Sequence, residues 1–248
     1  MSGWAVVIPV KGWGNAKTRM SELRTDDRRA LAFALAQDTV RTVCATPDVE
    51  LCVVVGPGEV LRDLRRCAGL EAVRGVEERR EASADSLNMA LLRGRDVALS
   101  AGYRQLAMIV ADLPALSVTA LRGFLRTVPA ASVAIVCDRS GSGTTIVAGR
   151  RGERVLPAFG PNSAARHIAN GAVDVTSRCD PWLRADVDTV ADLATARGAA
   201  VGPALRRWFD GGEMRSENRQ TGVVQHGGRI SEQLGALLAI DDPVIERQ

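Results

Sequence analysis

The stretch WAVVIPVKGWGNAKTR, residues 4–19, begins with an unbroken apolar run and ends in a loop that carries glycines and cations. A strand that is buried on both faces of a mostly parallel sheet has such a continuous apolar sequence, so residues 4–10 predict the first strand of an α/β protein. Lys11, Lys17 and Arg19 follow where this strand ends, interleaved with two glycines. Cations on a glycine-bearing loop suit a polyphosphate, although a solvated basic loop is the alternative.

This loop differs from two well-known nucleotide-binding motifs. Ala16 stands directly before Lys17, where a Walker A loop has glycine. Lys17 itself fills the third glycine position of the dinucleotide-binding pattern GxGxxG. Neither a P-loop nor a Rossmann fingerprint is therefore expected.

Strands and helices alternate along the chain beyond this loop. Apolar residues at helical or strand spacing predict, in order, a helix from residue 26, a strand at 51–55, a helix ending near 67, a helix at 85–101, and strands at 105–111 and 132–136. Such alternation predicts a doubly wound sheet. Ligands of such sheets bind at the carboxyl ends of the strands.

Length and composition limit the class of protein. A chain of 248 residues can form one sizeable core, and no apolar run is long enough to cross a membrane or resembles a signal peptide. The five cysteines are widely spaced and form no CxxC pair, which is typical of a reduced, cytoplasmic protein. A net charge of only +3 and few aromatic residues make nucleic acid an unexpected partner.

Three aspartates predict a metal site. Asp112 follows an apolar strand and should project into the ligand crevice, and Asp186 and Asp188 alternate in an extended segment, so that both face the same side. Carboxylates so close together repel each other unless a cation lies between them, and Mg²⁺ prefers such oxygen ligands. The alternative for Asp188 is that it caps the helix that follows.

A second group of residues predicts a smaller anion site. The segment GSGTT, residues 141–145, lies between two apolar segments and predicts a hairpin-like turn that presents the Thr144 hydroxyl. In AFGPNSAARH, residues 158–167, Gly160 begins a turn and Ser163 can cap a helix whose first N–H groups attract an anion. Arg166 and His167 follow; the alternative for His167 is a plain helix surface, and the alternative for Arg166 is an ion pair with an acidic neighbour.

Six motifs, in this order, resemble the guanylyltransferases of coenzyme F420 biosynthesis (CofC/FbiD-like), which attach GMP to 2-phospho-L-lactate, phosphoenolpyruvate or a related phosphorylated three-carbon acid. They are VIPVK with AKTR (7–19), LNMAL (87–91), DLPAL (112–116), GSGTT (141–145), FGPNSAARH (159–167) and DVDTVADL (186–193). The resemblance implies a single nucleotidyltransferase domain over residues 1–205, with a mostly parallel sheet, flanking helices and a GT-A-like fold similar to the nucleotide-diphospho-sugar transferases. Residues 206–248 would then be a C-terminal extension of unknown function. We expect disorder at residues 210–229 and a short amphipathic helix at residues 230–240.

The resemblance also implies roles for individual residues. Lys17, Arg19 and Lys11 would meet the GTP phosphates, and Asn88 would lie near the base. The acid would bind at Thr144, Gly160 and Ser163. Asp112, Asp186 and Asp188 would hold Mg²⁺, with Lys17, Asp112 and Asp188 as the catalytic groups.

Several alternatives and partners stay open at this stage. 3-Phosphoglycerate could replace phosphoenolpyruvate as the acceptor. Residues 186–190 also match the DxDx[TV] motif of haloacid-dehalogenase-type phosphatases, with Asp186 as the nucleophile, although that motif follows the first strand in those enzymes. A non-catalytic nucleotide-binding subunit is a third class. A homodimer and a hand-over of the labile product to the next enzyme are further partner hypotheses.

Overall fold

The computed structural model describes residues 3–66, 73–77 and 86–220, and in this part of the chain seven strands form one sheet. They are β1 (Trp4–Pro9), β2 (Val49–Gly56), β3 (Val73–Glu77), β4 (Gln105–Ile109), β5 (Val133–Cys137), β6 (Thr144–Gly149) and β7 (Val173–Asp174). Their spatial order is β3-β2-β1-β4-β6-β5-β7. Strand β6 is antiparallel to both of its neighbours, whereas the other pairs are parallel. The prediction of a mostly parallel sheet with flanking helices is confirmed.

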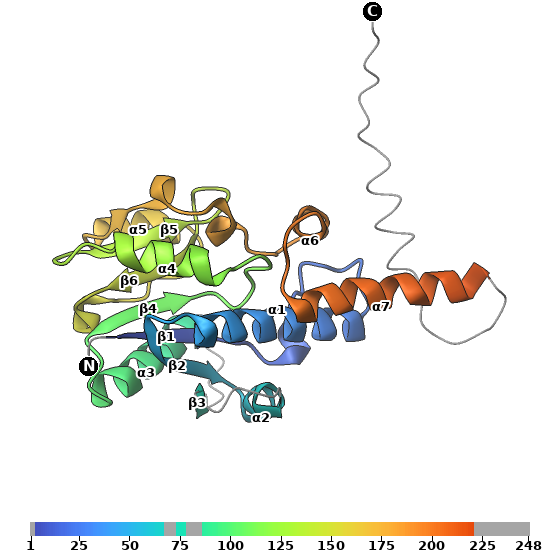
Figure 1. Cartoon of the computed structure of the whole chain (residues 1–248), viewed down its shortest axis with the longest axis horizontal. Helices are drawn as coiled ribbons and strands as arrows, with labels where there is room; N and C mark the ends of the chain where they lie inside the picture. The colour runs from blue at the N-terminus through green and yellow to red at the C-terminus, as the bar shows by residue number, and fades with distance from the viewer. Residues whose placement is uncertain (1–2, 67–72, 78–85, 221–248) are drawn as a thin grey trace, which may run out of the picture.

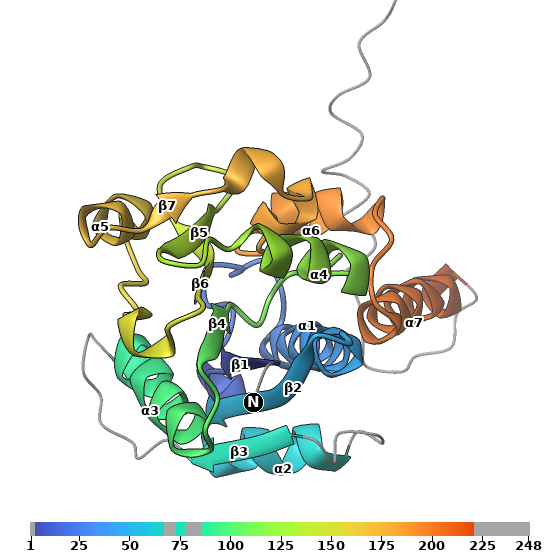
Figure 2. The same ribbon diagram turned by 60° about the vertical axis from the view of Figure 1, so that its left-hand side comes forward.

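Helices pack on both faces of this sheet (Figures 1 and 2). Seven α-helices are described: α1 (Thr25–Ala45), α2 (Gly58–Arg66), α3 (Ser86–Ser100), α4 (Val118–Thr127), α5 (Ser163–Ala169), α6 (Val190–Arg197) and α7 (Pro203–Gln220). Alternate residues of β1 explain the two layers, since Val6 and Ile8 pack with α1 and α4 and Ala5 and Val7 pack with α3. Burial on both faces is the reason why β1 has no polar residue.

A third apolar cluster lies beside α1, away from the sheet. It joins Leu31 and Leu35 of α1 to residues of α6 and α7 and also contains Met20 and Val187, which are fully or almost fully buried. Met20 lies in the same loop as Lys17, and Val187 lies between Asp186 and Asp188. Apolar packing therefore fixes the two segments that bring cations and carboxylates together.

Helix α7 is attached to α1 through a buried carboxylate. Asp38 of α1 accepts hydrogen bonds from the backbone N–H groups of Ala204 (3.0 Å) and Leu205 (2.8 Å) in the first turn of α7. A Cβ on Gly202 would lie 2.3 Å from the Asp38 carboxyl carbon, so only glycine allows this close approach. The charge of Asp38 also complements the positive end of the helix dipole.

Most predicted elements are confirmed within one to three residues, and the turn at 141–145 does join a hairpin, β5–β6.

The expectation of disorder from residue 210 is wrong as far as residue 220, because α7 continues to Gln220. The same helix crosses residue 205, where a single domain was expected to end, and buries Leu205 and Phe209 in the third cluster. The domain limits 1–205 stay a prediction, and the segment 230–240 lies outside the described residues. Among the described residues, no helix is both long and apolar enough to cross a membrane.

Candidate active site

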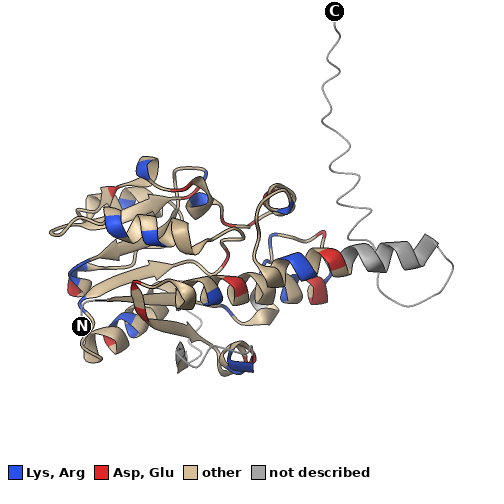
Figure 3. Cartoon of the chain, in the orientation of Figure 1, with Lys and Arg blue, Asp and Glu red and all other residues tan. Residues whose placement is uncertain are grey.

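The topology of the sheet brings the predicted residues to one edge. Strands β1 and β4 are parallel neighbours, so the loop after β1 and Asp112, which follows β4, emerge side by side. Strand β6 is antiparallel, and its beginning therefore lies at this same edge, where the Val110 N–H donates to the Thr145 carbonyl (3.1 Å). Figure 3 shows acidic segments on the loops that meet between the sheet and α6.

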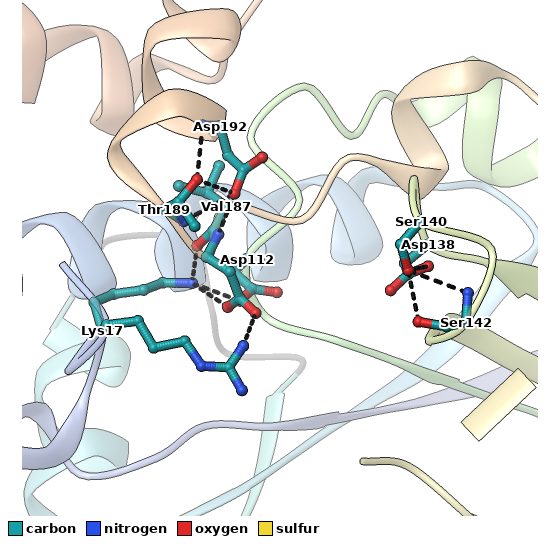
Figure 4. A network of polar contacts seen from close by, with 10 residues as sticks. Lys17, Asp112, Asp138, Ser140, Ser142, Val187, Thr189 and Asp192 are labelled. Carbon is teal, nitrogen blue, oxygen red and sulfur yellow. Dashed lines mark hydrogen bonds and ion pairs between the residues drawn. The ribbon is translucent and has the colours of Figure 1, made fainter. Parts of the chain in front are cut away.

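Lys17 is the centre of the cation–carboxylate contacts (Figure 4). Its ammonium donates to Asp112 Oδ2 (2.6 Å) and to the Val187 carbonyl, and it lies 3.9 Å from Asp188 Oδ1. The backbone at Lys17 has φ +53°, a left-handed conformation that residues other than glycine rarely adopt. Its side chain is only 9% exposed, so the ammonium is aimed inward rather than into solvent. The Val187 N–H in turn donates to the Asp112 carbonyl (3.2 Å) and completes the link between the two acidic segments.

The three predicted carboxylates lie near one another. Burial, followed by the charges of Asp112, Asp188 and Asp138, raises the pKa of Asp186 to about 7. The second oxygen of Asp112, Oδ1, is buried and has no hydrogen-bond partner among the described residues. A buried carboxylate oxygen without a donor suits a cation as its partner.

These carboxylates do not form a closed metal cage. Within the described ranges, no group of three His, Cys, Asp or Glu side chains converges closely enough to hold a metal ion unaided. The Lys17 ammonium lies among the carboxylates instead. Asp188 does not cap the next helix, because the Thr189 hydroxyl accepts from the Asp192 N–H (3.2 Å) and the Asp192 carboxylate accepts from the Thr189 N–H (2.8 Å). The Asp188 oxygens therefore face Lys17 and Arg19 rather than a helix end, and Asp112 Oδ1 has no donor in the described part of the chain.

The other two predicted phosphate cations are more exposed than Lys17. Arg19 pairs with Asp188 Oδ2 (3.0 Å), and its side chain is 77% exposed. Lys11 is exposed on the loop after β1. Exposed pairs add little stability, so Arg19 can exchange Asp188 for an anionic ligand at small cost.

The second predicted anion site is also brought together. Thr144 Oγ1 lies 3.1 Å from His167 Nδ1, the Ala164 N–H donates to the Ser142 carbonyl (3.1 Å), and the Ser163 N–H donates to the Gly160 carbonyl (3.1 Å). Ser163 is buried but is not a cap, because α5 begins after Asn162, which has φ +56° and no side-chain cap bond. Two N–H groups that were expected to be free for an anion are thus already used. His167 is 2% exposed, so the plain surface alternative is wrong for this residue.

Asn88 and Arg166 hold the segment that leads into this corner. The Asn88 amide donates to the Phe159 carbonyl (3.1 Å) and accepts from the Phe159 N–H (2.8 Å). Arg166 Nη2 donates to the carbonyls of Ala158 (2.7 Å) and Phe159 (2.9 Å). Both side chains therefore position backbone, and a base contact by Asn88 stays a prediction.

Comparison with known proteins gives the family. The model of the family described as "Guanylyl transferase CofC like" matches residues 4–194, which is most of the chain. The chain belongs to the CofC-like guanylyl transferase family. It is 40% identical over 207 residues to a phosphoenolpyruvate guanylyltransferase of Nocardia farcinica, covering 81% of this chain and 88% of the relative. A phosphoenolpyruvate guanylyltransferase of Streptomyces scabiei is 38% identical over 205 residues, covering 81% and 93%.

The fold of this CofC-like guanylyl transferase is also found in solved structures. A nucleotidyl transferase from Methanothermobacter thermautotroptrophicus superposes with a TM-score of 0.55 at 20% identity, covering 79% of this chain and 97% of that one. At this identity the likeness concerns the fold alone. It confirms the nucleotidyltransferase fold that the motifs predicted.

Three features of the CofC-like site were not found by the motifs. Asp138, in the β5–β6 turn, contributes to the raised pKa of Asp186. The Val187 carbonyl accepts from Lys17, and His167 contacts Thr144. The pattern of an apolar residue between two aspartates could have indicated that Val187 is an anchor, whereas nothing in the local sequence pairs His167 with Thr144.

Proposed function

We propose that this CofC-like guanylyl transferase transfers GMP from GTP to phosphoenolpyruvate and releases diphosphate, as a step of coenzyme F420 biosynthesis. The observation that supports this function most directly is that Lys17 joins Asp112 to the Asp186–Asp188 segment. This contact lies at the same sheet edge at which Thr144 begins β6. A cation-rich loop, a group of carboxylates and a polar corner are what a nucleotide, a metal and a small phosphorylated acid require.

The nucleotide half of the site rests on Lys17, with Arg19 and Lys11 beside it. A nucleoside triphosphate brings negative charge to a loop whose cations now face carboxylates, and Lys17 and Arg19 can turn from these carboxylates to phosphate oxygens. Exposed Lys11 can reach the same phosphates from the start of the loop. The carboxylates that are released need another positive partner.

A divalent cation, Mg²⁺ in our proposal, fits this need. Asp112 offers the unpartnered oxygen Oδ1, and Asp188 and Asp186 offer further oxygens that repel each other while they are ionised. When bound, such an ion neutralises charge on the phosphates as it builds during transfer. The residue types are the hard oxygen donors that Mg²⁺ prefers.

The chain needs no general base for this reaction. A phosphate oxygen of the acid is already anionic and attacks the α-phosphorus of GTP, while the bond to the β-phosphate breaks and diphosphate carries away the electron pair. Thr144, Gly160 and Ser163 hold the acid, and Lys17 neutralises charge between the two substrates. The rate then depends on positioning and electrostatics.

The names of the relatives favour phosphoenolpyruvate as the acceptor over 2-phospho-L-lactate and 3-phosphoglycerate. The phosphatase alternative receives no support from the site. The DxDx[TV] motif of those phosphatases follows the first strand, whereas residues 186–190 lead into α6, after the last strand of the described sheet. We also propose that the protein acts in the cytoplasm, while a homodimer and a hand-over of the product to the next enzyme stay predictions.

Mass spectrometry of reaction mixtures tests this function. The protein is incubated with GTP, Mg²⁺ and each of the three acids, and we expect diphosphate and a guanylylated product with phosphoenolpyruvate. Asp112→Asn should reduce kcat by at least about 100-fold, because it removes charge at the metal and at Lys17. Asp96→Asn is the matched control, since Asp96 is an exposed residue of α3 that pairs with its neighbour Arg95. Phosphate release from a monoester without GTP, or GTP binding without diphosphate release, would contradict the proposal.

A further inference from the structure

A buried histidine contacts the predicted acid-binding site formed by Thr144, Gly160 and Ser163. His167 of α5 is 2% exposed, and both of its ring nitrogens have partners. Nδ1 lies 3.1 Å from Thr144 Oγ1, and Nε2 accepts from the backbone N–H of Ala158 at 3.0 Å. The Phe159 ring meets the imidazole edge to face, with ring centroids 5.3 Å apart, which fixes the plane of the imidazole.

These two contacts determine which nitrogen carries the hydrogen. A backbone N–H can only donate, so Nε2 must present its lone pair to Ala158. In a neutral ring the hydrogen is then on Nδ1, where it serves both Thr144 Oγ1 and the backbone hydrogen bond with Ser163, and a protonated Nδ1 cannot accept from the Thr144 hydroxyl. Thr144 accepts at this contact, so the hydrogen of its own hydroxyl remains available to be donated to another acceptor.

The surroundings of His167 keep the ring neutral. Burial lowers its pKa, a backbone hydrogen bond with Ser163 opposes this shift, and the positive charge of Arg166 adds to the lowering. A protonated ring would also turn a second N–H toward the N–H of Ala158. The tautomer that follows from the hydrogen bonds is therefore the form present near neutral pH.

We infer that His167 is a positioning residue that makes the Thr144 hydroxyl a hydrogen-bond donor toward an anionic oxygen of the phosphorylated acid. Within the described part of the chain the Thr144 hydroxyl has no second hydrogen-bond partner, and Thr144 is 6% exposed. A buried hydroxyl hydrogen needs an acceptor, and the acid supplies phosphate and carboxylate oxygens. This inference rests on the proposed function, because it takes Thr144 as part of the acceptor site.

Hydrogen bonds around His167 hold the backbone of Ala158 and Phe159 in place. Ala158, whose N–H fixes the tautomer, also accepts from Arg166 Nη2 through its carbonyl (2.7 Å). Asn88 of α3 holds the next residue, Phe159, by two hydrogen bonds. His167 and Arg166 thus act on the same short segment from one helix, which keeps Ala158 in place for Nε2.

Nuclear magnetic resonance tests the tautomer without any use of activity. The chain has two histidines, His167 and His226, so the variant His226→Gln leaves a single imidazole whose ¹⁵N resonances can be read directly. We expect, at pH 7.5, a protonated Nδ1 and an unprotonated Nε2. A hydrogen on Nε2 would overturn the inference while leaving the proposed function intact.

Kinetics test the action through Thr144. Leu and Asn have the same branched shape, but only Asn has an N–H that can take the place of Nδ1. His167→Leu and Thr144→Val should each raise KM for phosphoenolpyruvate roughly 10- to 100-fold, as expected for a hydrogen bond to a charged group, with KM for GTP within about threefold. His167→Asn should recover most of this loss, and thermal melting shows which variants are folded.

The double variant separates positioning from general structural support. If His167 acts through the Thr144 hydroxyl, His167→Leu with Thr144→Val should resemble Thr144→Val alone, because the hydroxyl is already gone. Independent, multiplying effects would overturn the inference. An unchanged KM for phosphoenolpyruvate in active Thr144→Val would instead remove Thr144 from the acceptor site, and with it the proposed acid site.

Discussion

Replacement of Asp186 by Asn should separate the stability of the protein from its activity. Raising a carboxyl pKa from the ordinary 3.8 to about 7 corresponds to about 4 kcal/mol against the ionised form. This cost comes first from burial and then from the neighbouring carboxylates, and because the side chain is only partly buried, water reduces it to about 1–2 kcal/mol in practice. In a chelator at pH 8, Asp186→Asn should therefore be more stable than the wild type by about this amount, although its transferase activity should be lost.

The pH dependence gives the sign of this effect. Between pH 3.8 and about 7 the folded protein holds a proton on Asp186 that the unfolded chain has released. Stability of the wild type is therefore lost as pH rises through this window. The advantage of Asp186→Asn should shrink toward zero near pH 4 and be complete above pH 7.

Urea unfolding measures both variants, with and without Mg²⁺. Mg²⁺ should stabilise the wild type more than Asp186→Asn, because a ligand that binds only the folded state raises its stability. Asp96→Asn is again the control and should change the free energy of unfolding by less than about 0.5 kcal/mol. If Asp186→Asn is less stable than the wild type at pH 8 in chelator, burial and the neighbouring carboxylates do not oppose the charge of Asp186 as the structure indicates.

Three further changes test other parts of the structure. Asp38→Ala should lower the free energy of unfolding by about 3 kcal/mol in a urea titration, because two N–H groups at the start of α7 lose a charged acceptor. Gly160→Ala should cost about 1–2 kcal/mol and raise KM for the acid more than KM for GTP in steady-state assays, since φ is +114° and a Cβ would lie 3.3 Å from Arg166 Nη2. Because the pKa of His167 is lowered in the folded state, its contribution to stability should be complete above about pH 6.5 and lost as pH falls through the folded pKa. The melting temperatures of the wild type and His167→Asn should therefore approach each other toward acid pH.

Local sequence predicted the central strands well, because burial on both faces leaves a strong signal in a single segment. Strand β3, Val73–Glu77, has only two valines and pairs with one neighbour at the edge of the sheet, so its pattern is weak. Helix α4 was not among the predicted helices, although its sequence carries a usable signal. Ser117 caps it, and Leu121, Phe124 and Leu125 repeat at helical spacing.

The error at α7 has a tertiary cause. The residues from Asp210 onward contain two adjacent glycines and few apolar side chains, which indicate disorder when only the local sequence is considered. Helix α7 nevertheless begins earlier, at Pro203, where Asp38 caps it and Leu205 is buried. A helix that is capped and anchored from a distant segment can continue through a stretch of poor propensity.

For the site, the sequence could predict which residues gather but not how they are connected. Asp112 could be placed because it follows a strand, and Lys17 because it lies in the loop after another strand. The contact of Lys17 with the Val187 carbonyl depends on packing of Met20 and Val187 in the third cluster, which joins segments far apart in the chain. Pairing of His167 with Thr144 likewise depends on how α5 sits on the β5–β6 hairpin.

The reversal of β6 explains how one sheet edge can serve two substrates. In a wholly parallel sheet, residues at the beginning of a strand lie at the edge opposite the ligand crevice. Because β6 runs against β4 and β5, its first residue, Thr144, lies beside the loops that follow those strands. The hairpin turn also carries Asp138, whose charge contributes to the raised pKa of Asp186, and Ser142, whose carbonyl accepts from the Ala164 N–H of α5. One antiparallel strand thus places an uncharged hydrogen-bonding corner next to a cluster of cations and carboxylates, as a transfer between a nucleotide and a phosphorylated acid requires.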